Sequence, residues 1–377
     1  MGKWSSALEE LGISLGMNGQ VKSFFWLNKK VFLTGHTGFK GGWLSAWLSS
    51  MGAKVTGYAL APNTKPNLFE VASIESLCEQ SHIGDIRDLD ALRSAMVLAN
   101  PDIVIHMAAK PLVRYSYANP VDTYAINVMG TVNVLEAMRA CANIKAAVMV
   151  TTDKCYENKE WLWGYRENET LGGYDPYSNS KACAELVTAS YRQSFFSETE
   201  YVQHGVAIAT ARAGNVIGGG DWSADRLIPD AIAAFESNEV LLIRNPFSTR
   251  PWQDVLEPLT GYLLLAQALV EKGPAFNGAW NFGPNECDVR SVQEVVELLI
   301  QNWGSSASWR QDGKPAPHEA RSLKLDCSKA KEFLAWYPHW PLEEAVRAIV
   351  QWQKTLRSNG DILKVMHEQV DVYNRHG

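Results

Sequence analysis

The chain has 377 residues, of which 46% are hydrophobic, so it is long enough for two domains, or for one large domain with a lobe, and should fold as a compact globular protein. Its 35 Lys and Arg against 41 Asp and Glu give a net charge of −6 without any basic tract, which argues against a nucleic acid or an anionic membrane surface as partner. The six cysteines are scattered and do not cluster with the eight histidines, and no apolar run approaches about 18 residues, so we expect a cytoplasmic protein with reduced thiols, no metal site and no transmembrane helix.

The N-terminal segment contains a possible helical turn but no obvious core-facing pattern. We therefore expect residues 1–20 to form a loosely attached tail. Met17 is a candidate for the natural start, so the sequence leaves open whether residues 1–16 are native.

The stretch from Lys29 to Trp43 reads KKVFLTGHTGFKGGW and combines a short apolar strand, a glycine-rich turn and the start of a helix. Gly35 would permit the turn, Gly38 would let backbone N–H groups approach a pyrophosphate, and Gly41 would let the helix pack close to the strand. The helix N-terminus would add free N–H groups and a positive dipole for the phosphates. An ordinary turn is the competing interpretation because the spacing is G-x-x-G-x-x-G, but the position between the first strand and the first long helix favours a dinucleotide site.

Two further strand ends carry less decisive signals. The second strand, Lys54–Leu60, is followed neither by an acidic residue for a ribose 2′-hydroxyl nor by an arginine for a 2′-phosphate, so the residues leave the choice between NAD and NADP open. The third strand ends at Ile83, and Asp85 follows it at the edge where open α/β sheets bind ligands. Asp85 has a second interpretation, as the N-cap of a helix expected at Leu89–Leu98.

Strands and helices continue to alternate up to about residue 214. The apolar runs that predict buried parallel strands are 101–109, 145–151 and 206–211. Helices are expected between them, one of which carries Asn127. The alternation predicts an α/β fold of the Rossmann type, a doubly wound parallel sheet with right-handed crossovers.

A Tyr-x-x-x-Lys pair, Tyr177 and Lys181, opens a long helix that is expected to run to about Phe196. Residues four apart share one face of a helix, so the two side chains should lie together. Such a pair is common by chance and is more often a surface pair. Here it follows Thr152, at the end of a predicted strand, by 25 residues, which favours a catalytic pair.

After Asn215 the regular alternation of strands and helices gives way to an irregular stretch. We interpret this change as the start of a smaller, mixed α/β lobe that binds the substrate. The expected helices are at about 228–236, 262–270, 292–303 and 342–358, with a strand at 240–243. The apolar helix near 262–270 should pack back on the first domain. The predicted organisation is a dinucleotide-binding domain at 21–214 with a returning piece near 248–272, and a lobe made of 215–247 and 273–377.

From about residue 28 onward the chain resembles the extended short-chain dehydrogenase/reductase family. The motifs that carry this resemblance follow one another in order: Gly35 to Gly41, Asp85, His106 to Ala109, Asn127 to Thr131, Thr152 with Tyr177 and Lys181, and Arg212 to Gly218. The resemblance implies a nicotinamide cofactor, NAD, and a homodimer, or a dimer of dimers, built on the tyrosine helix and the helix before it.

The same resemblance implies the residues of the two binding sites. For the cofactor they are Gly35, Thr37, Gly38, Phe39, Lys40, Gly41, Asp85, Ile86, Ala108, Ala109, Lys110, Asn127, Thr151, Tyr177 and Lys181. For a nucleotide sugar they are Lys110, Arg114, Asn215, Arg226, Arg250 and Gln253.

Within the family, Thr152-Asp153 directly after a strand resembles the nucleotide-sugar 4,6-dehydratases, whose usual run is Thr-Asp-Glu. Lys154 stands where the Glu would be. This departure and the runs at 38–43, 153–158 and 250–253 are similar to the dehydratases that act on CDP-glucose, which implies CDP-glucose as the substrate and a place in deoxysugar biosynthesis of the O-antigen type. The residues themselves do not show the nucleotide base.

The resemblance implies a catalytic set of Thr152, Asp153, Lys154, Tyr177 and Lys181. Tyr177 would take the C4 hydroxyl proton with help from Lys181, Thr152 would hold the developing ketone, and Asp153 would protonate the departing C6 hydroxyl. Lys154 would either remove the C5 proton as a neutral amine, or stay charged and stabilise the enolate while another group serves as the base. Both roles stay open.

Two rival functions are consistent with much of this pattern. A nucleotide-sugar 4-epimerase would share Tyr177 and Lys181 but would not need Asp153-Lys154. A dinucleotide-binding regulatory protein without turnover is disfavoured because the Thr, Tyr and Lys set is complete.

Overall fold

The computed structural model describes residues 19–304, 307–312 and 323–376, so the candidate start at Met17 and all but the last two residues of the expected tail at 1–20 lie outside the described residues. Its largest sheet has seven parallel strands in the order β10-β6-β5-β4-β1-β2-β3. Their bounds are β1 Lys30–Thr34, β2 Lys54–Ala59, β3 Gln80–Ile83, β4 Ile103–His106, β5 Ala146–Val150, β6 Ala207–Ala213 and β10 Gly278–Phe282. The predicted doubly wound parallel sheet is confirmed.

Successive residues of the central strands enter two different cores, because side chains alternate across a strand. On β1, Val31 and Leu33 face one core and Phe32 faces the other, and on β4 Ile105 and Val104 divide in the same way. Both faces of the sheet are therefore buried, which explains why these strands read as continuous apolar runs.

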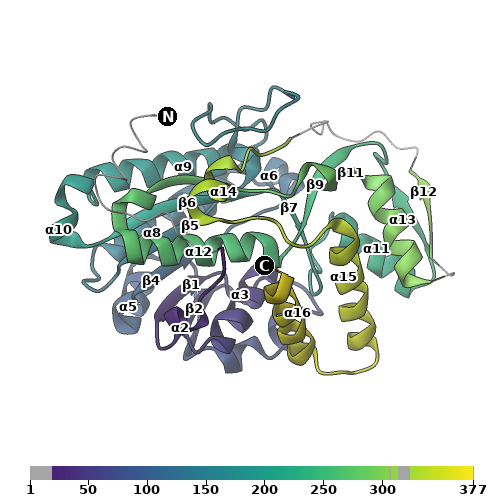
Figure 1. Ribbon diagram of the computed structural model, residues 1–377, viewed down its shortest axis with the longest axis horizontal. Coiled ribbons are helices and arrows are strands. Elements are labelled where there is room, and N and C mark those ends of the chain that lie inside the picture. The colour runs from purple at the N-terminus through teal and green to yellow at the C-terminus, as the bar shows by residue number, and fades with distance from the viewer. Residues whose placement is uncertain (1–18, 305–306, 313–322, 377) are drawn as a thin grey trace.

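Helices cover both faces of the sheet. The first core contains α3 (Phe39–Ser50), α12 (Leu256–Lys272) and α16 (Ile362–His376), and the second contains α5 (Leu89–Ala99), α8 (Gly130–Met138) and part of α9 (Pro176–Ser194). Shorter helices on this half of the molecule are α2 (Ser23–Trp26), α4 (Leu68–Val71), α6 (Val113–Ala118), α7 (Pro120–Tyr124), α10 (Tyr201–His204) and α14 (Ser328–Leu334). Figure 1 shows α12 running across the sheet, with α11, α13 and α15 gathered at one end of the molecule.

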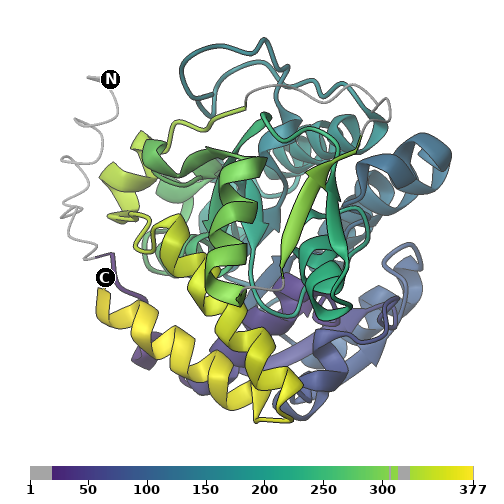
Figure 2. The ribbon, with the colours of Figure 1, turned by 90° about the vertical axis from the view of Figure 1, so that its right-hand side faces the viewer.

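That end of the molecule holds a third core, with two small sheets. One sheet has the order β11-β9-β7 and the other pairs β12 with β8. The elements are β7 Asn215–Ile217, α11 Leu227–Glu236, β8 Val240–Ile243, β9 Thr249–Asp254, β11 Val289–Ser291, α13 Val292–Trp303, β12 Ser308–Gln311 and α15 Leu342–Arg357. Figure 2 shows the two C-terminal helices in yellow, where α15 contacts α16 and α16 packs on α3.

The expected boundaries need two corrections. β10 was assigned to the lobe within 273–377, yet it forms the edge strand of the main sheet, where Gly278 pairs with Ala209. Because α12 ends at Lys272 beside that edge, a right-handed crossover brings the chain back as a parallel strand. The returning piece does not include β9, which pairs with β7 and β11. The rest of the division into a domain and a lobe stays a proposal.

The helix expected near 262–270 begins two turns earlier, at Leu256. Pro258 lies in its first turn, where backbone N–H groups have no partner within the helix, so proline is tolerated there. The helix is buried from Leu256 to Leu269, as expected for one that lies between the sheet and the C-terminal helices. Among the described residues, none of the helices has the length and hydropathy needed to cross a membrane.

Candidate active site

The glycine turn after β1 presents the N-terminus of α3. Gly35 has φ +84°, in the left-handed region that favours glycine, and its N–H donates to the carbonyl of Tyr58 at 2.9 Å. Gly38 is the exposed N-cap of α3 and offers no side-chain cap, so the first N–H groups of the helix are not satisfied by a capping side chain. A Cβ on Gly41 would lie 2.0 Å from the Gly35 carbonyl oxygen. This open helix N-terminus behind a close-packed turn fits an anionic diphosphate.

Replacing Gly41 by Ala is expected to weaken NAD binding about 10- to 100-fold, because the new methyl group would push the backbone of the turn aside at a cost of about 1–3 kcal/mol. Gly42→Ala is the matched control on the same helix, since its Cβ would meet the flexible end of Leu68 at 2.8 Å. Calorimetric titration with NAD checks both variants. Equal affinities for the two would contradict the assigned role of Gly41.

Two other predicted cofactor residues lie against this turn. The hydroxyl of Thr37 donates to the Leu60 carbonyl at 2.8 Å, which ties the turn to the end of β2. Phe39 contacts Gly218, where a Cβ would lie 2.9 Å from the Phe39 ring. The turn is therefore braced by neighbouring chain segments on two sides.

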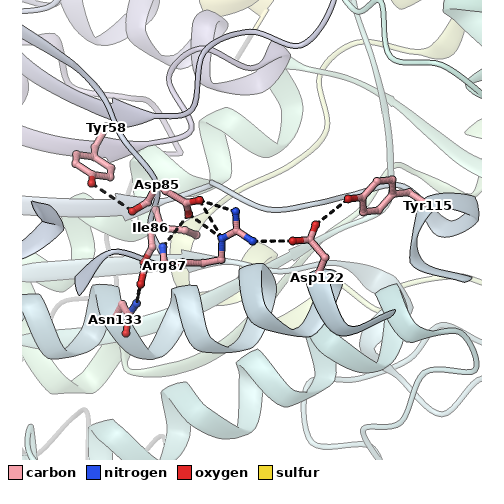
Figure 3. Close-up of polar contacts among 7 residues, drawn as sticks. All are labelled: Tyr58, Asp85, Ile86, Arg87, Tyr115, Asp122 and Asn133. Atoms are coloured by element: carbon pink, nitrogen blue, oxygen red, sulfur yellow. Dashed lines mark hydrogen bonds and ion pairs between the residues drawn. The ribbon is translucent and has the colours of Figure 1, made fainter. Parts of the chain in front are cut away.

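Asp85 follows β3, and its carboxylate is held by Arg87 (Figure 3), with Nη2 to Oδ2 at 2.6 Å and Nε to Oδ2 at 2.9 Å. Arg87 also donates to Asp122 at 2.6 Å, and Asp122 accepts a hydrogen bond from Tyr115 at 2.8 Å. The hydrogen bonds from Arg87 lower the pKa of Asp85 below its ordinary value. The carboxylate is thus ionised and fixed in direction.

The alternative interpretation of Asp85 as the N-cap of the next helix is wrong. Asp88 is the N-cap of α5, and its carboxylate accepts from the N–H of Ala91 at 3.0 Å. The helix begins at Leu89 as expected, so the cap must lie directly before it, three residues beyond Asp85. The neighbouring Ile86 is buried, and its carbonyl accepts from Asn133 (Figure 3).

The loop after β4 is held by Asn127. This residue lies on a π-helical turn, Ala125–Met129, of the kind often found at functional sites. Its side-chain oxygen accepts from the N–H of Lys110 at 2.8 Å, and its amide group donates to the Lys110 carbonyl and to Ser180 on α9. Ala108 to Lys110 are therefore joined to the helix that carries the catalytic candidates. The Lys110 ammonium lies 4.1 Å from the centroid of the Tyr115 ring.

The predicted catalytic residues come together from two elements. Thr152, Asp153 and Lys154 begin the short 3₁₀ turn after β5, and Tyr177 and Lys181 lie on the first turns of α9. Thr152 donates to the Asp153 carboxylate at 2.9 Å, and its hydroxyl acts on the neighbouring Tyr177, where it opposes the rise in pKa that burial causes. Lys181 donates to the carbonyl of Val150, at the end of β5, at 3.0 Å.

The environment shifts the protonation of these groups in different directions. Burial raises the pKa of Asp153, with the charge of Lys154 opposing the rise. Burial also raises the pKa of Tyr177 to about 12, against the effect of the Thr152 hydrogen bond. Burial lowers the pKa of Lys181 to about 8. The site therefore holds a carboxylic acid that retains its proton unusually well beside a phenol that needs positive charge to ionise.

Lys40 reaches this group of residues from the glycine turn. Its ammonium lies 5.8 Å from the centroid of the Tyr262 ring, and the charges of Lys181 and Arg226 add to burial in lowering its pKa to about 7. Tyr262 lies on α12, and its buried hydroxyl makes no hydrogen bond to the described residues. The glycine-turn motif predicts Lys40 as a cofactor residue, but nothing in the motif indicates that its side chain lies beside Lys181 and Tyr262. Tyr262 is not among the predicted site residues.

Two predicted phosphate ligands make ion pairs with aspartates in one loop. Arg114 on α6 is 2.6 Å from Asp225, and Arg226 is 2.9 Å from Asp221. Arg250, on β9, donates to the carbonyl of its neighbour Thr249 at 2.8 Å, and its charge acts on Asp153.

The last two predicted substrate residues lie on neighbouring strands of the small sheet. Asn215 begins β7 and is partly buried, and its register partner on β9 is Trp252. Gln253 is buried and donates to the Phe282 carbonyl at 3.1 Å, while its side-chain oxygen makes no hydrogen bond to the described residues. Gln253 is therefore tied to the end of β10 by its amide group.

Comparison with known proteins gives matches of three kinds. Residues 32–349 match the family model described as GDP-mannose 4,6 dehydratase. A CDP-glucose 4,6-dehydratase from Salmonella typhimurium is 55% identical over 349 residues, which cover 93% of this chain and 97% of the relative. A solved UDP-glucuronic acid 4-epimerase from Bacillus cereus, in complex with UDP-glucuronic acid and NAD, has a TM-score of 0.74 at 23% identity and covers 86% of this chain and 99% of that one. A dTDP-glucose 4,6-dehydratase from Streptomyces venezuelae with NAD bound has a TM-score of 0.72 at 21% identity and covers 88% and 99%.

Proposed function

This chain belongs to the GDP-mannose 4,6-dehydratase family, and from that premise we propose that it is a nucleotide-sugar 4,6-dehydratase that converts CDP-glucose to CDP-4-keto-6-deoxyglucose and water. The observation that carries the reaction is the buried Asp153, whose pKa burial raises and which accepts a hydrogen bond from Thr152, the residue whose hydroxyl acts on Tyr177. The 55% identity to the Salmonella typhimurium enzyme supports cytidine as the base.

NAD is the cofactor of this proposal. The open N-terminus of α3 fits its pyrophosphate, and the carboxylate of Asp85, which Arg87 holds, would accept a hydrogen bond from the adenine amino group. Lys110 and Asn127 fix the loop on the opposite side of the turn. When bound, NAD accepts a hydride from C4 of the sugar and later returns it to C6.

The residues of this chain move the protons. Tyr177 takes the proton of the C4 hydroxyl, and the nearby Lys181 ammonium favours its phenolate. Thr152 donates a hydrogen bond to the C4 oxygen, which orients the ketone. The ketone acidifies the C5–H, so that when a base removes this proton, the C6 hydroxyl leaves as water with the proton of Asp153. The base then returns a proton to C5, and the proton taken up by Tyr177 replaces the one that Asp153 gave to water.

Lys154 has two possible roles in this scheme, as the C5 base or as a cation that stabilises the enolate. Lys154→Met is expected to lower kcat about 100- to 1,000-fold in either case. Exchange of the substrate C5–H with solvent tests the base role, because it disappears in Lys154→Met if Lys154 is the base, and exchange at the normal rate would exclude that role. Lys159→Met is the matched control, since Lys159 is an exposed lysine of the following loop that pairs with Glu157.

The nucleotide diphosphate is proposed to lie against Arg114, Arg226 and Arg250. Arg114 and Arg226 would exchange their aspartate partners for phosphate oxygens, which accept the same bidentate donors. Asn215 and Gln253 would reach the sugar or the phosphates.

We also propose a homodimer through α7, the π-helical turn and α9. Val121, Met129 and Leu186 on these elements are apolar side chains that are 82%, 52% and 59% exposed, and a dimer interface there would bury them. Light scattering tests this, with twice the chain mass expected.

The function is tested by incubating the protein with NAD and, separately, CDP-glucose, dTDP-glucose, UDP-glucose and GDP-mannose. The alkali-induced near-ultraviolet absorbance of a 4-keto-6-deoxy sugar is expected with CDP-glucose. A signal with a different nucleotide alone would overturn the substrate but keep the reaction. Conversion of glucose to galactose without that absorbance would indicate the 4-epimerase, and NAD binding without any conversion would indicate the regulatory protein.

A further inference from the structure

The segment that carries the catalytic threonine is held at two points by side chains of α9. The carbonyl of Val150, before it, accepts from Lys181 at 3.0 Å. The hydroxyl of Thr151, directly beside Thr152, donates to the carboxylate of Glu185. Lys181 and Glu185 are four residues apart on α9 and so share one face of the helix. One helix face therefore sets the position of the end of β5.

The carboxylate of Glu185 accepts from four donors. Besides Thr151, Thr210 on β6 donates to Oε2 at 2.6 Å, and Arg212 donates from Nε at 3.0 Å and from Nη2 at 2.9 Å. The side chains of Glu185 and Arg212 are 4% and 3% exposed. Both carboxylate oxygens are fully used, so Glu185 has no capacity left to bind a substrate or move a proton. Burial alone would raise the pKa of Glu185, but Arg212 and the hydroxyl donors outweigh it and keep the carboxylate ionised.

Arg212 extends this network to the far end of the same segment. Its Nη1 donates to the Tyr156 hydroxyl at 2.7 Å, and Tyr156 donates to Asn281 on β10 at 2.7 Å. The guanidinium also lies 4.8 Å from the centroid of the Tyr156 ring. The 3₁₀ turn with Asp153 and Lys154 is thus fixed on both sides by one buried ion pair.

We propose that Glu185 is a positioning residue of the reaction: through Thr151 it aligns the catalytic Thr152, and it provides a buried negative charge one helical turn from Lys181. This inference rests on the proposed dehydratase function. It gives the buried Glu185–Arg212 ion pair a role in the reaction besides its role in the core. It also predicts that the alignment of Thr152 and the charge of Glu185 can be tested separately.

The charge effect follows from the groups that act on Lys181. Glu185 and the Cys155 thiol raise its pKa, against the larger effect of burial. Lys40 is the cation on the α3 side of the site, and His106 on β4 is neutral because burial lowers its pKa to about 3. Glu185 is thus the charged group that stabilises the ammonium. Without it, Lys181 should lose its proton at lower pH.

Alignment is tested with two threonines that bond the same carboxylate. Thr151→Val and Thr210→Val each remove one hydroxyl donor and leave the Glu185–Arg212 ion pair intact. Because only Thr151 adjoins the catalytic residue, Thr151→Val should lower kcat about 10- to 100-fold with KM for the sugar unchanged, while Thr210→Val should lose less than about 3-fold. Equal losses in the two variants would overturn the alignment role.

Charge is tested with Glu185→Gln and Glu185→Asp. Glu185→Gln should move the alkaline limb of the kcat–pH profile about one unit toward lower pH, whereas Glu185→Asp should lose kcat but keep the limb in place. A uniform loss at every pH in Glu185→Gln would overturn the charge role. If the buried Arg212 prevents Glu185→Gln from folding, the threonine pair and Glu185→Asp still decide the alignment role.

A test without turnover separates this inference from the proposed function. The Lys181 Cε resonance of protein labelled with ¹³C-lysine, assigned by Lys181→Arg, reports the titration of Lys181 directly. Its midpoint should fall in Glu185→Gln even if the wild-type protein converts none of the four nucleotide sugars. An unchanged midpoint would overturn the charge role whatever the substrate proves to be.

Discussion

Tyr177→Phe is expected to lower kcat for CDP-glucose about 1,000-fold, within the range for loss of a positioned acid–base group. The hydroxyl is buried beside Thr152, and its removal leaves the C4 proton without an acceptor in this scheme. The phenyl ring keeps the packing, so KM for the sugar and the melting temperature should change little. The measurement is the rate of 4-keto-6-deoxy sugar formation over a range of substrate concentrations.

Tyr124→Phe is the control for this variant. Its hydroxyl donates to Asn179 on α9 at 2.8 Å, so the same atom is removed from a hydrogen bond near the same helix but away from Thr152. Its kcat should stay within about 3-fold of the wild type. If Tyr177→Phe kept kcat within 10-fold, a different residue would have to take the C4 proton.

Asp153→Asn is expected to stop dehydration while leaving the oxidation of C4 intact. Without the acid, loss of the C6 hydroxyl should slow about 100- to 1,000-fold. Tyr177 and Thr152 are untouched, so reduced cofactor should accumulate when CDP-glucose is added and should be visible by its absorbance. Loss of both signals would show that Asp153 also serves the oxidation step.

The free energy of unfolding of Asp153→Asn shows whether its loss of activity comes from the missing acid or from unfolding. Because the folded pKa of Asp153 is raised, its carboxyl stabilises the protein most at low pH, and this contribution is lost as the pH rises through the folded value. Asn cannot ionise, so Asp153→Asn should be at least as stable as the wild type at neutral and alkaline pH. Asp254→Asn is the control, as burial raises the pKa of that buried carboxyl to about 7 outside the catalytic set.

The parts of the fold that could be predicted are those with a signal within a few residues. Three patterns can be recognised from neighbouring residues alone. They are the apolar run at β4, the turn from Gly35 to Gly41, and the four-residue spacing of Tyr177 and Lys181. The edge strand β10 was missed because five residues, with a polar Asn281 among them, resemble a loop until β6 lies beside them. α16 was missed although its apolar residues recur at helical spacing.

The missed parts of the site depend on partners far away in the chain. Glu185 looks like any surface glutamate on a helix, and only the fold brings it to Arg212, 27 residues later. Asp85 and Asp88 both suit a helix start, and the local pattern could not tell which of them Arg87 would hold. Contacts of this kind are set by tertiary packing, which a single sequence does not display.

The edge position of β10 also determines when during synthesis the nucleotide-binding half can be completed. β6 is paired on one side with β5, but its other partner is about 65 residues further along the chain, beyond the first half of the lobe elements. On a ribosome, residues 30–214 therefore emerge with an unpaired strand edge and without the helix that covers β5 and β6. The nucleotide-binding half and the lobe must consequently fold together. A chain cut at residue 214 would expose the unpaired edge of β6, which can pair with other chains and aggregate, instead of yielding a smaller nucleotide-binding protein.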